Sequence, residues 1–192
     1  PTFEVDSCGL LPTAPVKRPD LSAEQKKCCN EDKLQKGEAQ LKSNYQDAVT
    51  QAALFKLVPA DYGKGGATCN NSSSDILRTL VPFPQCWICY VESRWKRVWE
   101  NSFSYNDFQH AAIVCRGYGG NTYKEIIFDW WADTKFNRRN SGGSPDSFRN
   151  EYPLESKVSP DRYQYGTTDC QGNPLKPDLT PDCSFSTCRA KN

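Results

Sequence analysis

The chain has 192 residues, which is enough for one domain with a hydrophobic core of its own. Its 24 basic residues nearly balance its 23 acidic ones, and it has no run of about five or six like charges, so we expect neither nucleic acid nor an anionic lipid surface as a partner. No apolar stretch approaches the roughly 20 residues that cross a bilayer, so we expect no insertion into a membrane.

Ten cysteines and no methionine, in a chain that starts at Pro1, are typical of a mature secreted protein whose signal segment has been removed. We therefore expect an extracellular location and an oxidising environment in which disulfides form. Ten cysteines can form five bridges, whereas one catalytic thiol would leave a second cysteine unpaired. The cysteines are Cys8, Cys28, Cys29, Cys69, Cys86, Cys89, Cys115, Cys170, Cys183 and Cys188.

The first part of the chain is predicted to be an extended arm followed by helices. Residues 1–21 contain four prolines and little periodicity, so we expect an arm held through Cys8. A capping box begins a helix at Ser22, with Gln25 three residues after the hydroxyl. The next helix is indicated by a single apolar stripe that should pack on the core, formed by Leu34, Leu41, Tyr45, Ala48, Ala52 and Phe55.

The middle and the end of the chain are less regular. Pro59 and the glycines of GKGGAT end the long helix, and SSSDILRTL predicts a short helix directly after Cys69. Its buried side would be formed by Ile76, Leu77 and Leu80. Residues 81–107 fit either a strand or a helix. Residues 136–162 are predicted to be loop from their Asn, Gly, Ser, Pro and Arg content, and the last segment needs bridges to hold its shape.

His110, the only histidine, opens a strand-like run, HAAIVCRGY, and the segment NTYKEIIFD leads back beside it. Gly-Gly suits a two-residue hairpin turn because both positions tolerate positive φ, so we expect the turn at Gly119-Gly120. This register places Asp129 directly opposite His110 on one face, with Cβ atoms about 4.5–5.5 Å apart. A carboxylate at that distance can bond to the imidazole and fix its tautomer. The alternative is a strand-end histidine near a surface acid.

Cys69 is the cysteine best placed to supply a nucleophile for His110. It follows GKGGAT and directly precedes the predicted short helix, so unpaired N–H groups and the helix dipole would favour its thiolate form. The alternative is a disulfide between Cys69 and Cys86 or Cys115.

The order and spacing of these residues resemble the Cys-His-Asp core of the papain-like thiol hydrolases. The matching segments are GATCNNSSSDIL, then QHAAIVCRGYGG with its histidine 41 residues after the cysteine, then EIIFDWW with its aspartate 19 residues further on. In this superfamily, which includes transglutaminases, NlpC/P60 peptidases and secreted protein-glutaminases, a cysteine caps a helix that packs on an antiparallel sheet bearing the His and Asp. The resemblance covers roughly residues 65–135, and the protein-glutaminases are most similar in size, spacing and disulfide content.

The resemblance implies an α+β fold in which N-terminal helices pack on an antiparallel sheet, with a papain/transglutaminase-like core stabilised by disulfides. It also implies hydrolysis of amide bonds, above all deamidation of protein glutamine side chains, with Cys69 as nucleophile, His110 as base and Asp129 orienting the base. NlpC/P60-like peptidase and transglutaminase reactions use the same residues and are alternatives. The Cys69 N–H would hold the oxyanion together with one further donor, for which Gln85 and Asn70 are candidates.

Two tryptophans follow the aspartate directly. If the strand continues through Trp130 and Trp131, alternation points one of them with the Asp129 carboxylate toward a cleft and the other into the core. We treat both as candidate substrate-binding residues, with core packing as the alternative. The expected partner is a protein or peptide substrate, and we expect a monomer.

Neither a cofactor nor a metal is expected. Cys86 and Cys89 have the spacing of a redox motif, but no βαβ pattern surrounds them, so a plain disulfide role is favoured. Together with Cys28 and Cys29 they could form a four-cysteine zinc site, although such sites usually belong to reducing compartments.

We find no internal repeat and no second domain, so we expect one domain over residues 1–192. It would consist of an arm at 1–21, helices and the catalytic hairpin at 22–135, and a loop-rich, disulfide-pinned segment at 136–192. The competing interpretation is a non-enzymatic, disulfide-rich secreted binding or effector protein in which all ten cysteines are paired. The number of free thiols separates the two interpretations.

Overall fold

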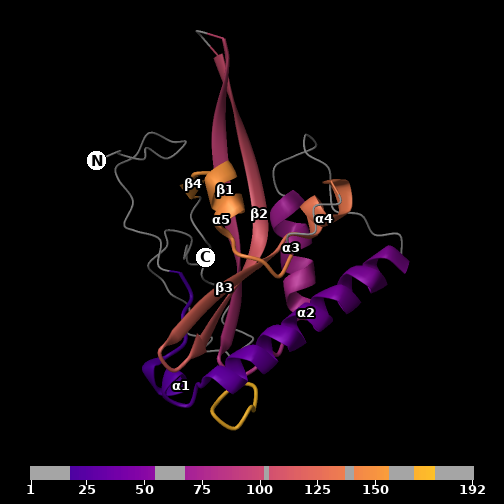
Figure 1. Cartoon of the computed structure of the whole chain (residues 1–192). Coiled ribbons are helices and arrows are strands. Elements are labelled where there is room, and N and C mark those ends of the chain that lie inside the picture. The colour runs from indigo at the N-terminus through magenta and orange to yellow at the C-terminus, as the bar shows by residue number, and fades with distance from the viewer. Residues whose placement is uncertain (1–17, 55–67, 102–103, 137–140, 156–166, 176–192) are drawn as a thin grey trace, which may run out of the picture.

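The computed structural model of the chain describes residues 18–54, 68–101, 104–136, 141–155 and 167–175 (Figure 1). At 68–71, 98–101, 104–108, 135–136 and 155 it describes the backbone alone. Most of the predicted arm, Phe55 and the cysteines Cys8, Cys183 and Cys188 therefore lie outside the described residues.

A four-stranded antiparallel sheet forms the centre of the fold, in the order β3-β2-β1-β4. β1 (Trp87–Asn101) and β2 (Ser104–Gly119) form a long hairpin that extends beyond the other strands (Figure 1). β3 (Thr122–Phe128) and the short β4 (Leu154–Glu155) flank this hairpin. The segment 81–107, for which strand and helix were both open, is therefore mainly strand, and His110 lies within β2 rather than at its start.

The predicted helices are confirmed, with one corrected boundary. α1 (Ala23–Lys27) begins at the capping box, in which the side chains of Ser22 and Gln25 accept from each other's backbone N–H groups. α2 (Glu31–Leu54) buries the apolar stripe, and Gly37 as well, because the Trp87 ring lies where a side chain at Gly37 would be. α3 (Thr68–Thr79) begins one residue before Cys69, whereas we expected it to begin after that residue.

The helices cover both faces of the sheet. α2 packs on one face, where the Trp87 indole N–H donates to the Leu34 carbonyl and Tyr45 stacks on Phe128. α3 packs against α2 and against β1 and β2, and α4 (Trp130–Phe136) follows the end of β3 and contacts α3. α5 (Asp146–Glu151) lies on the other side of the β1–β2 hairpin from α3 and α4 (Figure 1).

Residues 141–155 form a strap across the sheet, where the composition had predicted only loop. Gly142 and Gly143 bond to the backbone of Ile127 at the outer edge of β3, α5 follows, and β4 pairs with β1. Phe148 is buried and Arg149 forms ion pairs with the sheet. Tertiary packing therefore stabilises a helix of six residues that is too short to be stable alone.

The β2–β3 turn lies one residue later than predicted. Gly119 pairs with Thr122, so the turn residues are Gly120, at φ 74°, and Asn121. The register is thereby shifted by two residues, and Asp129, the first residue after β3, falls next to the Ile113–Phe128 pair rather than opposite His110. Because side chains alternate with a period of two, a shift of two residues leaves Asp129 and His110 on the same face.

Three disulfides join the described residues: Cys28–Cys170, Cys29–Cys86 and Cys89–Cys115. The plain disulfide role of Cys86 and Cys89 is confirmed, and the four-cysteine zinc alternative is wrong because all four sulfurs are in bridges. The two disulfides considered for Cys69, with Cys86 or with Cys115, are wrong for the same reason.

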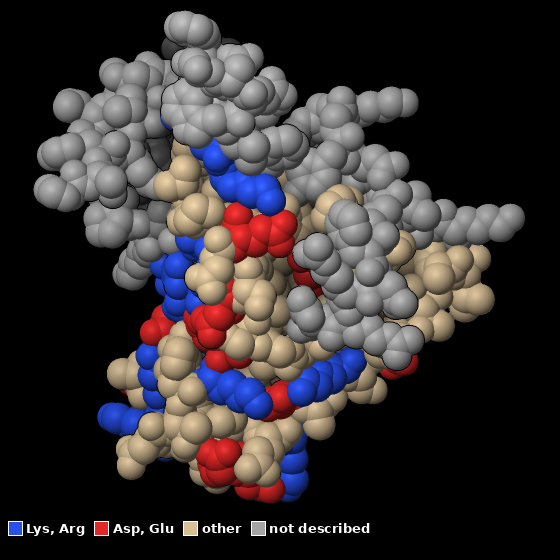
Figure 2. All heavy atoms as spheres, turned by 45° about the horizontal axis from the view of Figure 1, so that its top comes forward, with Lys and Arg blue, Asp and Glu red and all other residues tan. Residues whose placement is uncertain are grey.

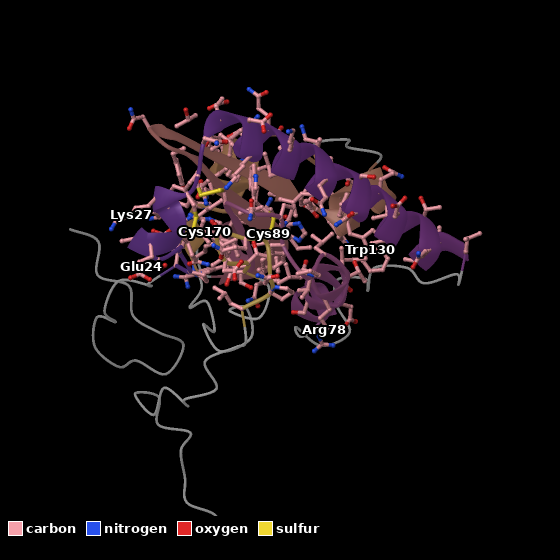
Figure 3. All side chains as sticks on the ribbon, turned by 90° about the horizontal axis from the view of Figure 1, so that it is seen from below. Glu24, Lys27, Arg78, Cys89, Trp130 and Cys170 are labelled. Carbon is pink, nitrogen blue, oxygen red and sulfur yellow. A yellow bond between two sulfur atoms is a disulfide. The ribbon has the colours of Figure 1, made fainter. Side chains whose placement is uncertain are left out.

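The bridges tie distant segments together. Cys89 and Cys115 are directly opposite in β1 and β2. Cys170 brings the segment 167–175 against α1, beside Glu24 (Figure 3). None of the helices within the described ranges is long and apolar enough to span a bilayer.

Candidate active site

His110 and Asp129 form the centre of the candidate site. His110 Nε2 and Asp129 Oδ2 are 2.7 Å apart, so the predicted contact between the two side chains is confirmed. It survives the changed register because diagonal neighbours on one face of a sheet are still within reach of long side chains. Both residues are buried, with 2% of His110 and 8% of Asp129 exposed. Because a carboxylate only accepts hydrogen bonds, a neutral imidazole in this contact would carry its proton on Nε2 and its lone pair on Nδ1.

The junction of β3 and α4 fixes the Asp129 carboxylate. Oδ1 accepts from the Ala132 N–H at 3.0 Å, so Asp129 acts as the N-cap of α4. The Asp129 N–H donates to Ser141 Oγ at 3.0 Å, and its carbonyl accepts from the Asp133 N–H at 2.9 Å. One residue therefore follows a strand, begins a helix and orients the histidine.

Aromatic rings surround the His110 imidazole. Their centroids lie 5.1 Å away for Trp131, 5.6 Å for Phe148 and 5.3 Å for Tyr152. These rings shield the bond to Asp129 from water, which strengthens it. Phe148 and Tyr152 belong to the strap, so its loop-like composition concealed both contacts.

A buried cluster of charged side chains lies beside His110 on the same face. Arg94, the cross-strand partner of His110, donates to Glu92 at 3.0 Å. Arg149 of α5 donates to Glu92 at 2.7 Å and also to Glu125 of β3. These ion pairs hold α5, and with it the rings of Phe148 and Tyr152, against His110.

The same ion pairs control the protonation of the two glutamates. Burial raises the pKa of Glu125, but the hydrogen bonds from Arg149, Tyr123 and Arg116 outweigh burial and hold it at about 2, below the ordinary 4.5. Burial also raises the pKa of Glu92, but the bonds and positive charges of Arg149, Arg18 and Arg94 together outweigh burial, so the net direction is downward. Figure 2 shows that acidic and basic side chains are interspersed over the described part of one face of the molecule.

α3 brings Cys69 into the neighbourhood of the histidine. Cys69 lies in the first turn of α3, and Ser73, one turn later on the same side of the helix, donates to the Ala111 carbonyl at 2.9 Å. Ala111 directly follows His110 in β2. β3 has ended at this level, and the start of α4 takes its place beside β2. The side chain of Cys69 lies outside the described residues.

The structure separates Gln85 from the site. Its amide group donates to the carbonyls of Asp169 and Cys170. Gln85 precedes β1 at the end of the sheet where Trp87 pairs with Gly117, which is about 23 Å along β2 from His110 at roughly 3.3 Å per residue. Gln85 is therefore wrong as an oxyanion donor.

The other expected residues are neighbours of Asp129 or Cys69 in the sequence. Trp130 and Trp131 begin α4 instead of continuing β3, because Asp129 caps a helix there. Trp130 is buried in the core, which confirms the core alternative for this residue, whereas Trp131 packs on His110. Asn70 is in the first turn of α3, and its side chain lies outside the described residues.

Among the described residues, no three His, Cys, Asp or Glu side chains converge in a way that could hold a metal ion. Comparison of the chain with models of protein families, with curated proteins and with solved structures finds no match. Function has to be inferred from the residues themselves.

Proposed function

We propose that the protein is a secreted thiol hydrolase that deamidates glutamine side chains of proteins, with Cys69, His110 and Asp129 as its triad in a papain/transglutaminase-like core. The observation that carries the proposal is the buried 2.7 Å contact between His110 Nε2 and Asp129 Oδ2. A carboxylate in this position holds the imidazole in one orientation and one tautomer, as a general base requires.

The position of α3 supports Cys69 as the nucleophile. The N–H groups in the first turn of this helix of 12 residues have no partner within the helix, and such groups favour a thiolate. The bond from Ser73 holds the same side of α3 against the carbonyl of Ala111, the residue that follows His110 in β2. Cys86 and Cys115 are bonded to other cysteines, so neither removes Cys69 from the reduced state.

The proposed triad requires the Cys69 thiol to lie within reach of His110 Nδ1. The His110 side chain lies on the sheet face to which α5 is joined, whereas α2 packs on the opposite face. The Cys69 thiol must therefore meet Nδ1 at the edge of β2 where β3 has ended. α3 contacts both β2 and α4, which begins at this edge.

In the proposed reaction, His110 Nδ1 takes the thiol proton of Cys69, and the thiolate attacks the side-chain carbonyl carbon of a glutamine. The intermediate collapses as His110 passes the proton to departing ammonia, which leaves a thioester. His110 then takes a proton from water as the water oxygen attacks the thioester carbon. The C–S bond breaks, His110 returns the proton to the Cys69 sulfur, and the glutamate product is released. The Cys69 N–H is available to the oxyanion. An amine in place of water gives transglutamination, and attack on a backbone amide gives peptidase activity.

Ammonia release from an unfolded, glutamine-rich protein tests this function. We expect Cys69→Ala and His110→Ala each to abolish release, because each removes a reacting group. Arg78→Gln, at an exposed position of the same helix α3, is the matched control and should leave the rate unchanged. Full activity in either triad variant would remove that residue from the mechanism, and new peptide termini in place of ammonia would identify a peptidase.

A non-enzymatic secreted binding or effector protein is the second candidate. The observation that favours it is the burial of His110 beneath Phe148 and Tyr152. Six of the ten cysteines are already in bridges, and the other four could form two more. This candidate predicts no free thiol in the native protein and no release of ammonia.

A further inference from the structure

A chain of hydrogen bonds runs behind Asp129, on the side away from the imidazole. Ser141 Oγ accepts from the Asp129 N–H at 3.0 Å and donates its own proton to Asp133 Oδ2. Tyr45 of α2 donates to the same Oδ2 atom at 2.7 Å. Three separate segments, α2, α4 and the strap, therefore meet at one carboxylate next to Asp129.

The chain places two carboxyl groups one helical turn apart. Asp129 caps α4 and Asp133 follows four residues later on the same side of the helix, where its N–H bonds the Asp129 carbonyl. Burial raises the pKa of Asp133, and the charge of Asp129 raises it further, whereas the bonds from Ser141 and Tyr45 act in the opposite direction. The net direction is upward, and the two hydroxyls reduce the cost of a second negative charge beside Asp129 without removing it.

Hydrogen bonds between the strap and β3 position Ser141 beside Asp129. Gly142 N–H donates to the Ile127 carbonyl at 2.7 Å, and Ile127 N–H donates to the Gly143 carbonyl at 3.0 Å. These bonds attach Gly142 and Gly143 to the outer edge of β3 and hold Ser141 beside Asp129, the residue that follows the strand. The Asp129 backbone is therefore fixed from a segment 12 residues away in sequence.

We propose that Ser141 is a positioning residue for the triad, and that it acts together with Asp133 and Tyr45 by fixing Asp129 and thereby the tautomer of His110. Its catalytic meaning rests on the proposed function, but its effect on His110 does not. Ser141 touches neither the imidazole nor a reacting atom. It acts on the base only through the backbone of Asp129.

Nitrogen NMR of the imidazole tests the proposal directly, because His110 is the only histidine and its signals need no assignment. In the unmodified protein the neutral ring should be in the Nε2–H tautomer. In Ser141→Ala the Nδ1–H tautomer should become populated, since Asp129 is less firmly held. Ser141→Thr keeps the hydroxyl and should restore the original spectrum, and Ser43→Ala, at an exposed position of α2, should leave it unchanged.

Tyr45→Phe is the second variant, and it covers the case in which Ser141→Ala fails to fold. It keeps the ring that stacks on Phe128 at 4.6 Å between centroids and removes only the hydroxyl. We expect the same direction of change in the tautomer ratio. Folded Ser141→Ala or Tyr45→Phe protein with an unchanged Nε2–H tautomer would overturn the proposal, as would failure of Ser141→Thr to restore it.

Activity separates this proposal from the proposed function. If the protein deamidates glutamine, Ser141→Ala should lower kcat about 10- to 100-fold with little change in KM, as expected when a catalytic group is misplaced. An inactive unmodified protein whose His110 tautomer still responds to Ser141→Ala would refute the function and support the positioning role. An active protein whose kcat and His110 tautomer are unchanged by Ser141→Ala would support the proposed function and refute the positioning role.

Discussion

Replacing Asp129 by two different residues should separate its structural role from its role toward His110. Asp129→Ala removes the N-cap of α4, worth about 1 kcal/mol, and leaves the buried His110 Nε2–H without its partner, which costs about 1–3 kcal/mol. We therefore expect a loss of about 2–4 kcal/mol in the free energy of unfolding. Asp129→Asn keeps a good N-cap, and its amide N–H can donate to Nε2 if the imidazole changes tautomer. Its loss should be about 1 kcal/mol or less.

The stability of Asp129→Asn comes with a consequence for catalysis. Once the asparagine donates to Nε2, the His110 proton moves to Nδ1, which is the nitrogen that would have to accept the thiol proton. An imidazole held in the wrong tautomer lowers kcat on the order of 10⁴-fold in a triad whose geometry is otherwise intact. The more stable of the two variants should therefore be essentially inactive.

The unmodified protein, Asp129→Ala and Asp129→Asn are compared. Urea unfolding measures their stability, imidazole NMR measures the tautomer of His110, and ammonia release measures activity. Equal destabilisation by Ala and Asn would show that the cap and the amide contribute nothing. Asn protein that keeps both the Nε2–H tautomer and full activity would refute the assignment of Nδ1 as the base.

Three further predictions concern the surroundings of the site. Gly37→Ala should lower the free energy of unfolding by about 1–3 kcal/mol, although Ala normally favours a helix, because its Cβ would clash with the Trp87 ring. Thermal melts of this variant and of Ser43→Ala on the same helix measure the loss. Because the pKa of Glu125 is lowered to about 2, its ionised side chain contributes of order 3 kcal/mol to the free energy of unfolding above pH 4.5, and this contribution is lost as the pH falls toward about 2. In Glu125→Gln, the free energy of unfolding in urea should therefore depend less on pH between pH 5 and pH 2. An unchanged pH dependence would contradict a stabilising role of the Glu125 ion pairs. Ser73→Ala should lower the free energy of unfolding by about 1 kcal/mol and slow the alkylation of Cys69, because α3 loses its hydrogen bond to β2. An unchanged alkylation rate would show that this bond does not position the start of α3.

The elements with strong local patterns were predicted well from the sequence. Ser22 and Gln25 fix the start of α1 by bonds within four residues, and the stripe from Leu34 to Ala52 follows from helical periodicity alone. The strap was missed because α5 depends on partners far away in the chain, such as Glu92 for Arg149. Composition describes a segment in isolation, and such partners are invisible to it.

The pair at the centre of the site was predicted for a reason that was partly wrong. The turn is at Gly120-Asn121, not Gly119-Gly120, yet the resulting shift of two residues preserves the face on which His110 and Asp129 meet. A shift of one residue would have separated them. Gln85 failed as a candidate because its amide bonds to the carbonyls of Asp169 and Cys170 at the far end of β2 from His110, partners that the sequence does not reveal. Ser141 was missed because a serine among loop residues carries no pattern.

Quantitative alkylation followed by peptide mass spectrometry decides whether Cys69 is a reduced, activated thiol. We predict that native protein at neutral pH is alkylated at Cys69, that His110→Ala slows this reaction, and that denatured, unreduced protein has at least two free thiols, since ten cysteines less one leave an odd number. Recovery of Cys69 in a disulfide-linked peptide, with no free thiol in the denatured protein, would contradict the claim and favour the non-enzymatic protein.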